Sequence, residues 1–402
     1  MSETPISPAY LRRNGGFGPD AATTRLRERA GIERVSTPFG FDAWLVTRHA
    51  DVRQVLSDPK RFGIALPPEY SRRMAGQEMN DEDVSRERAG DLLSQDPPEH
   101  TRLRRMLAPA FTVHQVRWLR PWIEGIVADH LDAMERAGPP VDLVQAFALP
   151  IPSLVICELL GVPYPDRAEF QHLASRSLDL SRPPDERTAS FRQIRAYMAG
   201  LATRARTDPG EGMLGTLARE HGHDLTTGEL AAIGHLMLIA GYETTANMLA
   251  LGTLALLRHP GQLRILRDQP ARTDAGVEEL LRWLTIVNTA TPRTATEPVE
   301  ISGQRIEAGE TVLACLPTAN RDPALVPDPE ILDLTRGGAG HVAFGHGIHH
   351  CLGAPLARAE MRIAFPALLR RFPALRLADP RADVPFRAAG FLHGVARLPV
   401  VW

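Results

Sequence analysis

One cysteine flanked by glycines near the C-terminus limits what this chain can fold into more than any other feature. The sequence there reads Phe344-Gly-His-Gly347-Ile-His349-His-Cys351-Leu-Gly353. A deprotonated cysteine sulfur is a soft, electron-rich metal ligand. A wide, flat group can approach the backbone only where side chains are absent, which would account for Gly347 and Gly353. The pattern therefore predicts a thiolate that is presented to something large and flat.

The residues after Cys351 favour this interpretation. Residues 352–369 follow a helical pattern, so the sulfur is expected at a helix N-terminus, where backbone N–H groups and the helix dipole stabilise an anion. Ligation of haem iron by a thiolate favours cleavage of the O–O bond. The alternative for a lone cysteine is a buried structural residue in a glycine-rich loop. The fixed offsets of Phe344, Gly347 and Gly353 argue against that alternative.

The composition describes a globular chain without a bias toward charged partners. With 402 residues, 44% of them hydrophobic, the chain can bury a large core. The formal net charge of −2 gives no global case for nucleic acid or an acidic membrane surface as a partner. The three cysteines, Cys157, Cys315 and Cys351, are too few and too far apart for a disulfide framework or a zinc or iron–sulfur site. We therefore expect a cytoplasmic protein, with Cys157 in its core.

No membrane segment is expected either. Residues 1–13 are polar and contain proline, without the apolar centre of a signal peptide. The longest apolar stretch, residues 233–257, contains Glu243 and Asn247, which a membrane-spanning helix would normally exclude.

Helical patterns far outnumber strand patterns along the chain. A capping box, Thr226-x-x-Glu229, opens the longest helix, which would run to His259 and span about 45–50 Å. Other helices are expected at 50–56, 112–138, 149–160 and 274–284, and the β-rich parts at roughly 34–48, 299–316 and 386–402. We expect one mainly α domain with small β-sheets over residues 1–402.

The middle of the longest helix reads AGYETT over residues 240–245 and is a second candidate site. The Thr244 hydroxyl can bond back to the Ala240 carbonyl, which loosens a helical hydrogen bond and bends the helix. Gly241 lowers the cost of distortion and lets a small or flat ligand lie close. A buried Glu243 needs solvent or a partner, and an acid beside an alcohol makes a plausible proton path. The alternative is a kinked structural helix with a surface glutamate.

Two charged pairs lie at helical spacing. Glu279 and Arg282 are three residues apart, and His100 and Arg104 are four apart, so each pair shares one face of a helix. Such pairs are common and contribute little by themselves.

Taken together, these motifs resemble those of the cytochrome P-450 superfamily, and the resemblance spans essentially the whole chain. The cysteine motif matches F-x-x-G-x-x-x-C-x-G at every fixed position, Glu279 and Arg282 match E-x-x-R, and Glu243-Thr244 matches the acid–threonine motif of the long helix. The resemblance implies the family's mainly α fold, with haem b between the long central helix and the helix after the cysteine. It is strongest to soluble, actinobacterial-type haem-thiolate monooxygenases.

The resemblance also implies roles for single residues. Cys351 would be the axial ligand of the haem iron, and Thr244 and Glu243 would manage protons. The other implied positions are Ala240, Gly241, Phe344, Gly347 and Gly353 around the haem, His100, Arg104, Arg293 and His349 at its two propionates, and Glu279, Arg282 and Arg336 in a buried network that supports the cysteine loop. His341, His346 and His350 are expected to be solvated or packing residues.

The predicted function is insertion of one oxygen atom from O2 into an apolar small molecule, by hydroxylation or epoxidation, in the tailoring of polyketide-like secondary metabolites. Electrons would come from a ferredoxin and its reductase, which would dock near Arg102, Arg105 and Arg358. The substrate contacts that the resemblance implies fall in residues 62–95, 165–200, 236–244, 286–291 and 390–393. The alternatives are a peroxide-driven haem-thiolate enzyme and a non-enzymatic haem-based gas sensor or carrier.

Overall fold

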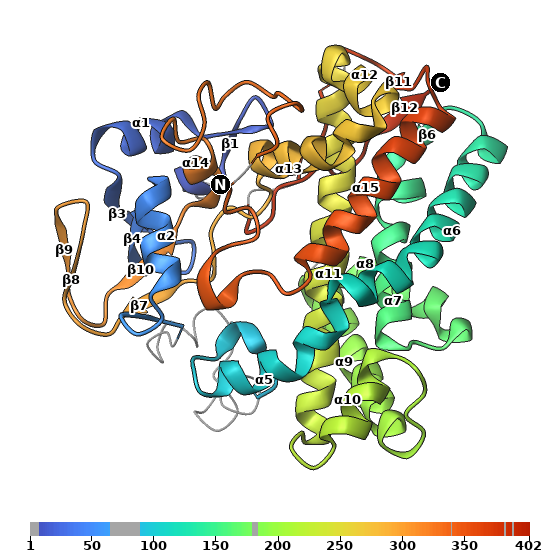
Figure 1. Cartoon of the computed structure of the whole chain (residues 1–402), viewed down its shortest axis with the longest axis horizontal. Coiled ribbons are helices and arrows are strands. Elements are labelled where there is room, and N and C mark those ends of the chain that lie inside the picture. Colours follow the sequence, from blue (N-terminus) through green and yellow to red (C-terminus); the bar gives the residue numbers. More distant parts are fainter. Residues whose placement is uncertain (1–7, 65–88, 179–183, 339, 382, 388–389) are drawn as a thin grey trace.

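Helices make up most of the chain and the sheets are small, as the sequence predicts. The largest sheet lies at one side of the molecule, and a three-stranded sheet lies near the C-terminus at the other (Figure 1). The computed structural model describes residues 8–64, 89–178, 184–338, 340–381, 383–387 and 390–402. The helices are α1 Ala21–Arg29, α2 His49–Ser57, α5 Glu99–Leu107, α6 Val113–Ala137, α7 Pro150–Leu160, α8 Arg167–Leu178, α9 Pro184–Thr207, α10 Met213–His221, α11 Thr227–Arg258, α12 Pro260–Asp268, α13 Thr273–Leu284, α14 Leu316–Asn320 and α15 Ala354–Arg371.

The longest helix, α11, begins at the predicted capping box. The Thr226 hydroxyl accepts the Glu229 N–H at 3.1 Å, and the Glu229 carboxylate accepts the Thr226 N–H at 2.7 Å. Its 32 residues correspond to about 48 Å, and Figure 1 shows it running the height of the molecule beside α15. Glu229 also forms an ion pair with Arg102 of α5, so the helix start is fastened to a second element.

The largest sheet has five strands in the order β3-β4-β10-β7-β5. The strands are β1 Arg13–Asn14, β2 Gly18–Pro19, β3 Ile32–Ser36, β4 Asp42–Val46, β5 Phe62–Gly63, β6 Val141–Asp142, β7 Arg293–Ala295, β8 Val299–Ile301, β9 Gln304–Ile306, β10 Thr311–Ala314, β11 Arg376–Leu377 and β12 Pro399–Val401. β3 and β4 form the predicted antiparallel hairpin, and β10 lies parallel to β4.

The C-terminal β-rich part is less regular than the sequence predicts. Of residues 386–402, the stretch Pro399–Val401 is a strand, and the described residues before it contribute the single bridges Phe386↔Val395 and Val287↔Leu392. The turn between these bridges lies against residues 286–288, because the Asn288 N–H donates to the Phe391 carbonyl at 2.9 Å and the His393 N–H to the Ile286 carbonyl at 2.7 Å.

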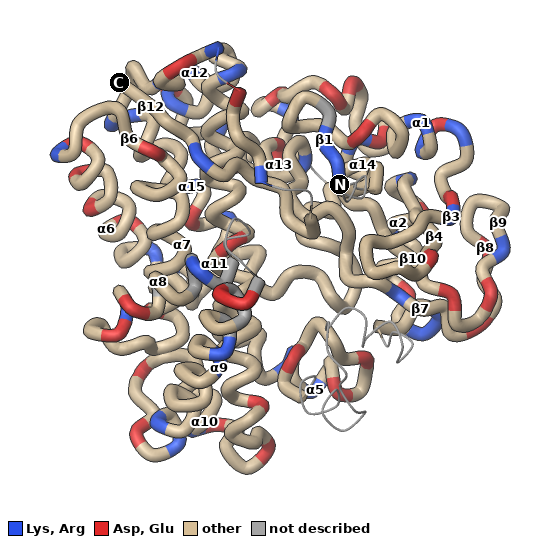
Figure 2. Tube along the Cα trace, turned by 180° about the vertical axis from the view of Figure 1, so that it is seen from behind, with Lys and Arg blue, Asp and Glu red and all other residues tan. Residues whose placement is uncertain are grey.

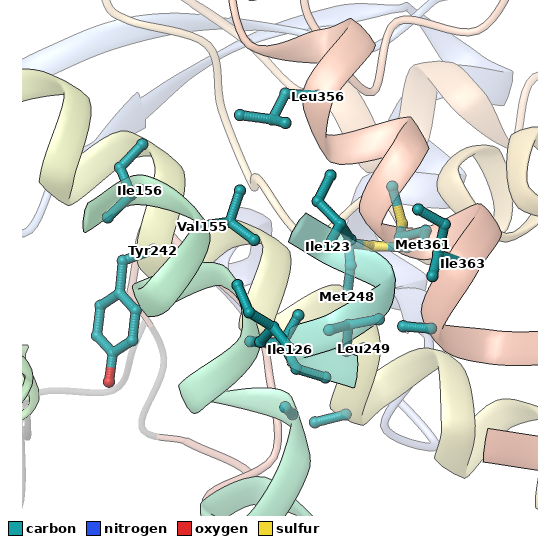
Figure 3. Packing of buried hydrophobic residues seen from close by; sticks show 14 of the residues in the cluster. Ile123, Ile126, Val155, Ile156, Tyr242, Met248, Leu249, Leu356, Met361 and Ile363 are labelled. Atoms are coloured by element: carbon teal, nitrogen blue, oxygen red, sulfur yellow. The ribbon is translucent and has the colours of Figure 1, made fainter. Parts of the chain in front are cut away.

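The main hydrophobic core lies where four helices meet. Figure 3 shows side chains from α6, α7, α11 and α15 interdigitating there: Ile123, Ile126, Val155, Ile156, Met248, Leu249, Met361 and Ile363. Cys157 of α7 is fully buried in this core, as predicted. The core holds α11 and α15 next to each other and so determines the spacing of the two candidate motifs.

Charge is dispersed over the molecule. Figure 2 shows acidic and basic residues interspersed along the described trace, which agrees with a chain of 46 basic and 48 acidic residues. In the same described part, the helices include none that is long and apolar enough to span a membrane.

Candidate functional site

A cavity of about 510 Å³ lies between α11 and the cysteine loop. Mostly apolar side chains form its wall, as is usual for a site that takes an organic ligand. The wall includes Ala240, Gly241, Thr244, Thr245 and Met248 from α11, and Phe344, Cys351, Gly353, Leu356 and Ala357 from the loop and α15. The two motifs that the sequence singles out, more than 100 residues apart, therefore meet at one cavity.

Cys351 lies three residues before α15 and has surface that borders the cavity. Its N–H donates to the Phe344 carbonyl at 2.9 Å, which fixes the loop. Burial raises the pKa of the Cys351 thiol, against the N–H groups of Gly353 and Ala354 and the charge of Arg104, which lower it. These donors at the helix start are suited to stabilise a thiolate once a metal cation is bound to it.

The two glycines of the cysteine motif are needed for different physical reasons. The reason for Gly347 differs from the one expected from the sequence. Gly347 adopts φ +70°, and an added Cβ would lie 2.1 Å from the Leu56 carbonyl oxygen of α2. Close packing of protein on protein, rather than room for a flat ligand, therefore requires Gly347. Gly353 borders the cavity, and an added Cβ would meet no protein atom nearer than Phe111 Cε1 at 3.9 Å, so the space beside it is left open.

Two histidines beside the cavity have ring nitrogens without partners. His100 of α5 and His349 of the cysteine loop lie with ring centroids 4.2 Å apart. His100 Nε2 and both ring nitrogens of His349 are buried and make no hydrogen bond in the described structure. Burial, assisted by the charge of Arg293, lowers the pKa of His349 to about 3. Buried polar atoms normally have partners, so these nitrogens indicate a polar group of a ligand.

Two arginines face the same region. Arg104 of α5 and Arg293 of β7 both border the cavity. Arg104 donates to the His350 carbonyl at 2.7 Å and Arg293 to the Thr291 carbonyl at 3.1 Å. Arg293 is 3% exposed, and burial lowers its pKa to about 10. A buried cation is costly unless an anion compensates it, so this end of the cavity is suited to bind a carboxylate-bearing group.

The Thr244 hydroxyl lies on the cavity wall and bonds back to the Ala240 carbonyl at 2.6 Å, as the sequence predicts. The expected bend is not marked enough to interrupt α11, which is continuous from Thr227 to Arg258. Gly241 also borders the cavity, but a Cβ there would lie 2.7 Å from Ile156 Cδ1 of α7. A larger residue at position 241 would therefore require the end of the Ile156 side chain to shift.

Glu243 points away from the cavity. The wall formed by the described residues includes Thr244 but not Glu243. Its carboxylate pairs with Arg387 of the C-terminal segment and is 14% exposed. Burial raises the pKa of Glu243, and Arg387 partly opposes this rise. The buried acid thus has the partner that its position requires, and this partner lies 144 residues away in sequence.

The Glu279–Arg282 pair is completely buried. The two side chains are joined by two hydrogen bonds of 2.7 and 2.8 Å, and Arg282 also donates to the Asn320 and Pro329 carbonyls. The Asn320 side chain accepts the Val342 N–H at 2.7 Å, which connects the pair to the cysteine loop.

Arg336 does not join this network. Its hydrogen bond goes to the Asp328 carbonyl at 3.4 Å, and Glu279 takes the Asp333 N–H at 3.2 Å instead. Arg321 is more deeply buried than Arg336: it is 2% exposed, and it pairs with Glu330 at 2.5 Å.

Two of the arginines expected at a docking surface are engaged within the protein. Arg102 pairs with Glu99 and Glu229. Arg358 pairs with Glu278 at 2.7 Å, and its guanidinium carbon lies 4.5 Å from the centre of the Phe344 ring. Both guanidinium groups are thus paired with carboxylates of the protein.

Of the other loop histidines, His341 is a packing residue, in line with the expectation. His341 is almost fully buried and bonds to Glu278 at 3.1 Å. His346 and His350 border the cavity.

The predicted substrate regions contribute unequally to the cavity wall. Residues 236–244, 286–291 and 390–393 all do so, through side chains such as Met237, Val287 and Phe391. The described residues of 165–200 contribute none, because this part of α9 packs on the outside of α11, where Met198 contacts Gly234. Of residues 62–95, Leu92 and Leu93 line the cavity, and 65–88 lie outside the described residues.

Comparison with known proteins shows the class to which this fold and site belong. The family model "Cytochrome P450" matches residues 271–387. Cytochrome P450 FAS1 of Rhodococcoides fascians is 45% identical over 402 residues, 100% of each chain. Nocardicin C N-oxygenase of Nocardia uniformis subsp. tsuyamanensis is 42% identical over 98% of this chain and 97% of its own. The solved structure of P450 StaH, from biosynthesis of the glycopeptide antibiotic A47934, superposes with a TM-score of 0.89 at 46% identity, covering 99% and 100% of the two chains.

The chain belongs to the cytochrome P450 family and is a P450 monooxygenase. The family uses haem b, and the residues present fit this group. A cysteine borders a mostly apolar cavity. At one end of this cavity, two arginines and the unpartnered histidine nitrogens are suited to bind the carboxylates of haem.

Gly347→Ala should lower the free energy of unfolding by several kcal/mol. The left-handed backbone costs a non-glycine residue about 1–2 kcal/mol, and the contact with the Leu56 carbonyl adds an overlap that backbone atoms cannot relieve. Urea denaturation followed by circular dichroism measures the change.

Gly309→Ala is the matched control, because Gly309 has φ +86° and nothing within 4 Å of an added Cβ. It should show the conformational cost alone. Equal losses in the two variants would contradict the role of the Leu56 contact.

Proposed function

We propose that this monooxygenase inserts one oxygen atom from O2 into an apolar small molecule, by hydroxylation or epoxidation, in the tailoring of a polyketide-like secondary metabolite. A ferredoxin and its reductase supply the electrons. The observation that carries this proposal is that the Cys351 sulfur and the Thr244 hydroxyl border the same mostly apolar cavity. A metal ligand and a proton-handling group thus meet where an apolar substrate can enter.

In this assignment the cavity residues bind and orient haem. Cys351 would ligate the haem iron, and Arg104, Arg293, His100 and His349 would hold the two propionates, which would compensate the buried guanidinium groups and satisfy the histidine nitrogens. Ala240, Gly241, Phe344 and Gly353 would border the ring, while Gly347 shapes the loop from outside. Haem bound in this way supplies the activation of O2 and the oxidation itself.

Thr244 and Glu243 handle protons. The Thr244 hydroxyl donates to the Ala240 carbonyl and keeps two lone pairs, so it can accept a hydrogen bond from water in the cavity. Glu243 lies next to it in sequence, outside the wall, and burial raises the pKa of its carboxyl. A proton held at Glu243 therefore reaches the cavity only after the carboxylate leaves Arg387 or through water beside Thr244.

The substrate class follows from the wall and from relatives. Leu236, Ile286 and Phe391 present apolar surface to the cavity. The similar proteins include an N-oxygenase of nocardicin C and a P450 from glycopeptide antibiotic biosynthesis, which supports a role in secondary metabolism. The polyketide-like class remains a prediction from the sequence. The three free cysteines support a location in the cytoplasm.

Two alternative functions, a peroxide-driven enzyme and a haem-based sensor or carrier, account for fewer features of the site. Neither needs a hydroxyl and a buried acid on the helix opposite the cysteine.

Turnover of a compound panel with isotope-labelled O2 tests the proposal. With ferredoxin, reductase and reduced nicotinamide nucleotide, we expect one labelled oxygen atom in the product. Product formed equally well from peroxide without a redox partner would favour the peroxide-driven enzyme, and no product with any compound would favour the sensor or carrier.

Thr244→Ala should leave haem content and substrate affinity nearly unchanged and divert electrons to hydrogen peroxide. The alanine fits the same helix but removes the hydroxyl from the cavity wall. A loss of about 2 kcal/mol of transition-state stabilisation would lower the ratio of product to hydrogen peroxide about thirtyfold. Thr253→Ala is the control, because its hydroxyl bonds back to Leu249 in the same helix but is buried in the core. Unchanged coupling in Thr244→Ala would leave the hydroxyl only a structural role.

Arg387→Ala should shift the pH dependence of coupling to higher pH. Burial raises the pKa of Glu243 and Arg387 lowers it, so removal of the guanidinium lets this pKa rise further, and the carboxyl stays protonated at higher pH. Product per reductant, measured across pH, reports the shift. Arg397→Ala removes a charge from the same segment whose contact with Asp142 is 3.7 Å and largely exposed, and it should not move the profile. Identical profiles for the two variants would exclude Glu243 from proton delivery.

A further inference from the structure

We propose that Glu278, in addition to the neighbouring Glu279, is a carboxylate that positions the cysteine loop for thiolate ligation. This inference rests on the proposed role of Cys351 as the axial ligand. Glu278 lies outside the E-x-x-R motif. Its two partners, His341 and Arg358, are distant in sequence, so the sequence pattern does not predict these contacts.

The Glu278 carboxylate binds groups from the loop and from α15. Arg358 donates to its two oxygens at 2.7 and 2.9 Å, and His341 Nε2 lies 3.1 Å from Oε2. Arg362 of α15 approaches at 3.5 Å. The Glu278 side chain is 20% exposed, so these contacts form in partly buried surroundings, where charge-assisted hydrogen bonds are strong.

The two partners of Glu278 contact Phe344, which holds Cys351, and its neighbour Ala343. The Arg358 guanidinium lies over the Phe344 ring, and the Phe344 carbonyl accepts the Cys351 N–H at 2.9 Å. His341 Nδ1 accepts the Ala343 N–H at 3.2 Å. Nδ1 is therefore unprotonated and Nε2–H donates to Glu278. The Glu278 carboxylate thus holds the backbone at Ala343 through His341, and it holds the Phe344 ring through Arg358.

Glu279 acts on a different part of the structure. Successive helical residues point about 100° apart, and Glu279 turns into the core, where both of its oxygens bind Arg282. Through the hydrogen bonds of the described residues, Glu279 reaches the loop in series, by way of Arg282, Asn320 and the Val342 N–H. Loss of Glu279 would therefore disturb the fold as a whole, whereas loss of Glu278 acts on the loop.

The ionised carboxylate of Glu278 compensates the positive charges of the arginines that face it. Burial alone would raise the pKa of Glu278, but the hydrogen bonds of His341 and Arg358 and the charge of Arg358 outweigh it and lower the pKa to about 2. Arg362 faces Glu278 from α15 and also pairs with Asp274 of α13 at 3.1 Å. The carboxylate is thus ionised at neutral pH and keeps Arg358 over Phe344.

Glu278→Gln tests this role in the haem-loaded protein, because glutamine keeps the size and removes the charge. The loop is read by the red-shifted carbon monoxide band of the reduced protein, and the fold by circular dichroism, both during urea titration. We expect the band to disappear at a lower urea concentration than the helical signal, with the equilibrium for holding the loop weakened about tenfold relative to wild type, which corresponds to about 1.4 kcal/mol. Asp274→Asn is the control, since it removes a charge from the same helix that is 75% exposed and pairs with Arg362 of α15 rather than with a residue of the loop.

In wild type and Asp274→Asn, the band and the helical signal should be lost together. If Glu278→Gln also loses them together, Glu278 only stabilises the fold and the inference is wrong. If Glu278→Gln does not fold, Arg358→Lys decides by the same criterion, since it keeps the charge but not the two-point contact. Absence of the red-shifted band in wild type would contradict the proposed function itself, whereas its presence with unchanged behaviour in Glu278→Gln contradicts only this inference.

Discussion

The structure depends on holding one cysteine sulfur, as a potential anion, at the wall of an apolar cavity. Burial opposes ionisation of the Cys351 thiol, so the protein must supply donors in a fixed geometry. The start of α15 supplies the N–H groups of Gly353 and Ala354, and the hydrogen bond to Phe344 fixes the loop that carries the sulfur. The core between α11 and α15 then sets the distance from this sulfur to Thr244 on the opposite helix.

Two buried or partly buried carboxylates of α13 support the region around this loop in different ways. The fully buried Glu279–Arg282 pair joins α13 to the segment that leads into the loop. Removing one member would cost about 3–5 kcal/mol because the other charge would remain buried without a partner. Glu278, one residue earlier, contacts the loop and α15 directly. Two adjacent acids of one helix thereby support the fold and the ligand loop separately.

Local interactions could be predicted from the sequence, and distant ones could not. The capping box of Thr226 and Glu229 and the back-bond of Thr244 each close within one helical turn, so residue type and spacing suffice to predict them. The partners of Glu243 and Glu278 lie 144 and 80 residues away, and periodicity carries no information about such pairs. For Gly347, the motif predicted the need for glycine, but the reason, a contact with α2, is tertiary. Arg336 was assigned to the Glu279 network through the resemblance, whereas its guanidinium bonds to the Asp328 carbonyl.

The carbon monoxide difference spectrum of the reduced protein, compared between wild type and Cys351→Ser, tests the central claim most directly. A thiolate ligand gives the red-shifted band, and a serine hydroxyl is a poor ligand for this iron. We predict that wild type shows the band and that Cys351→Ser loses it, even where the arginines and histidines around the cavity still retain haem. A Cys351→Ser protein that keeps the red-shifted band would show that another residue binds the iron.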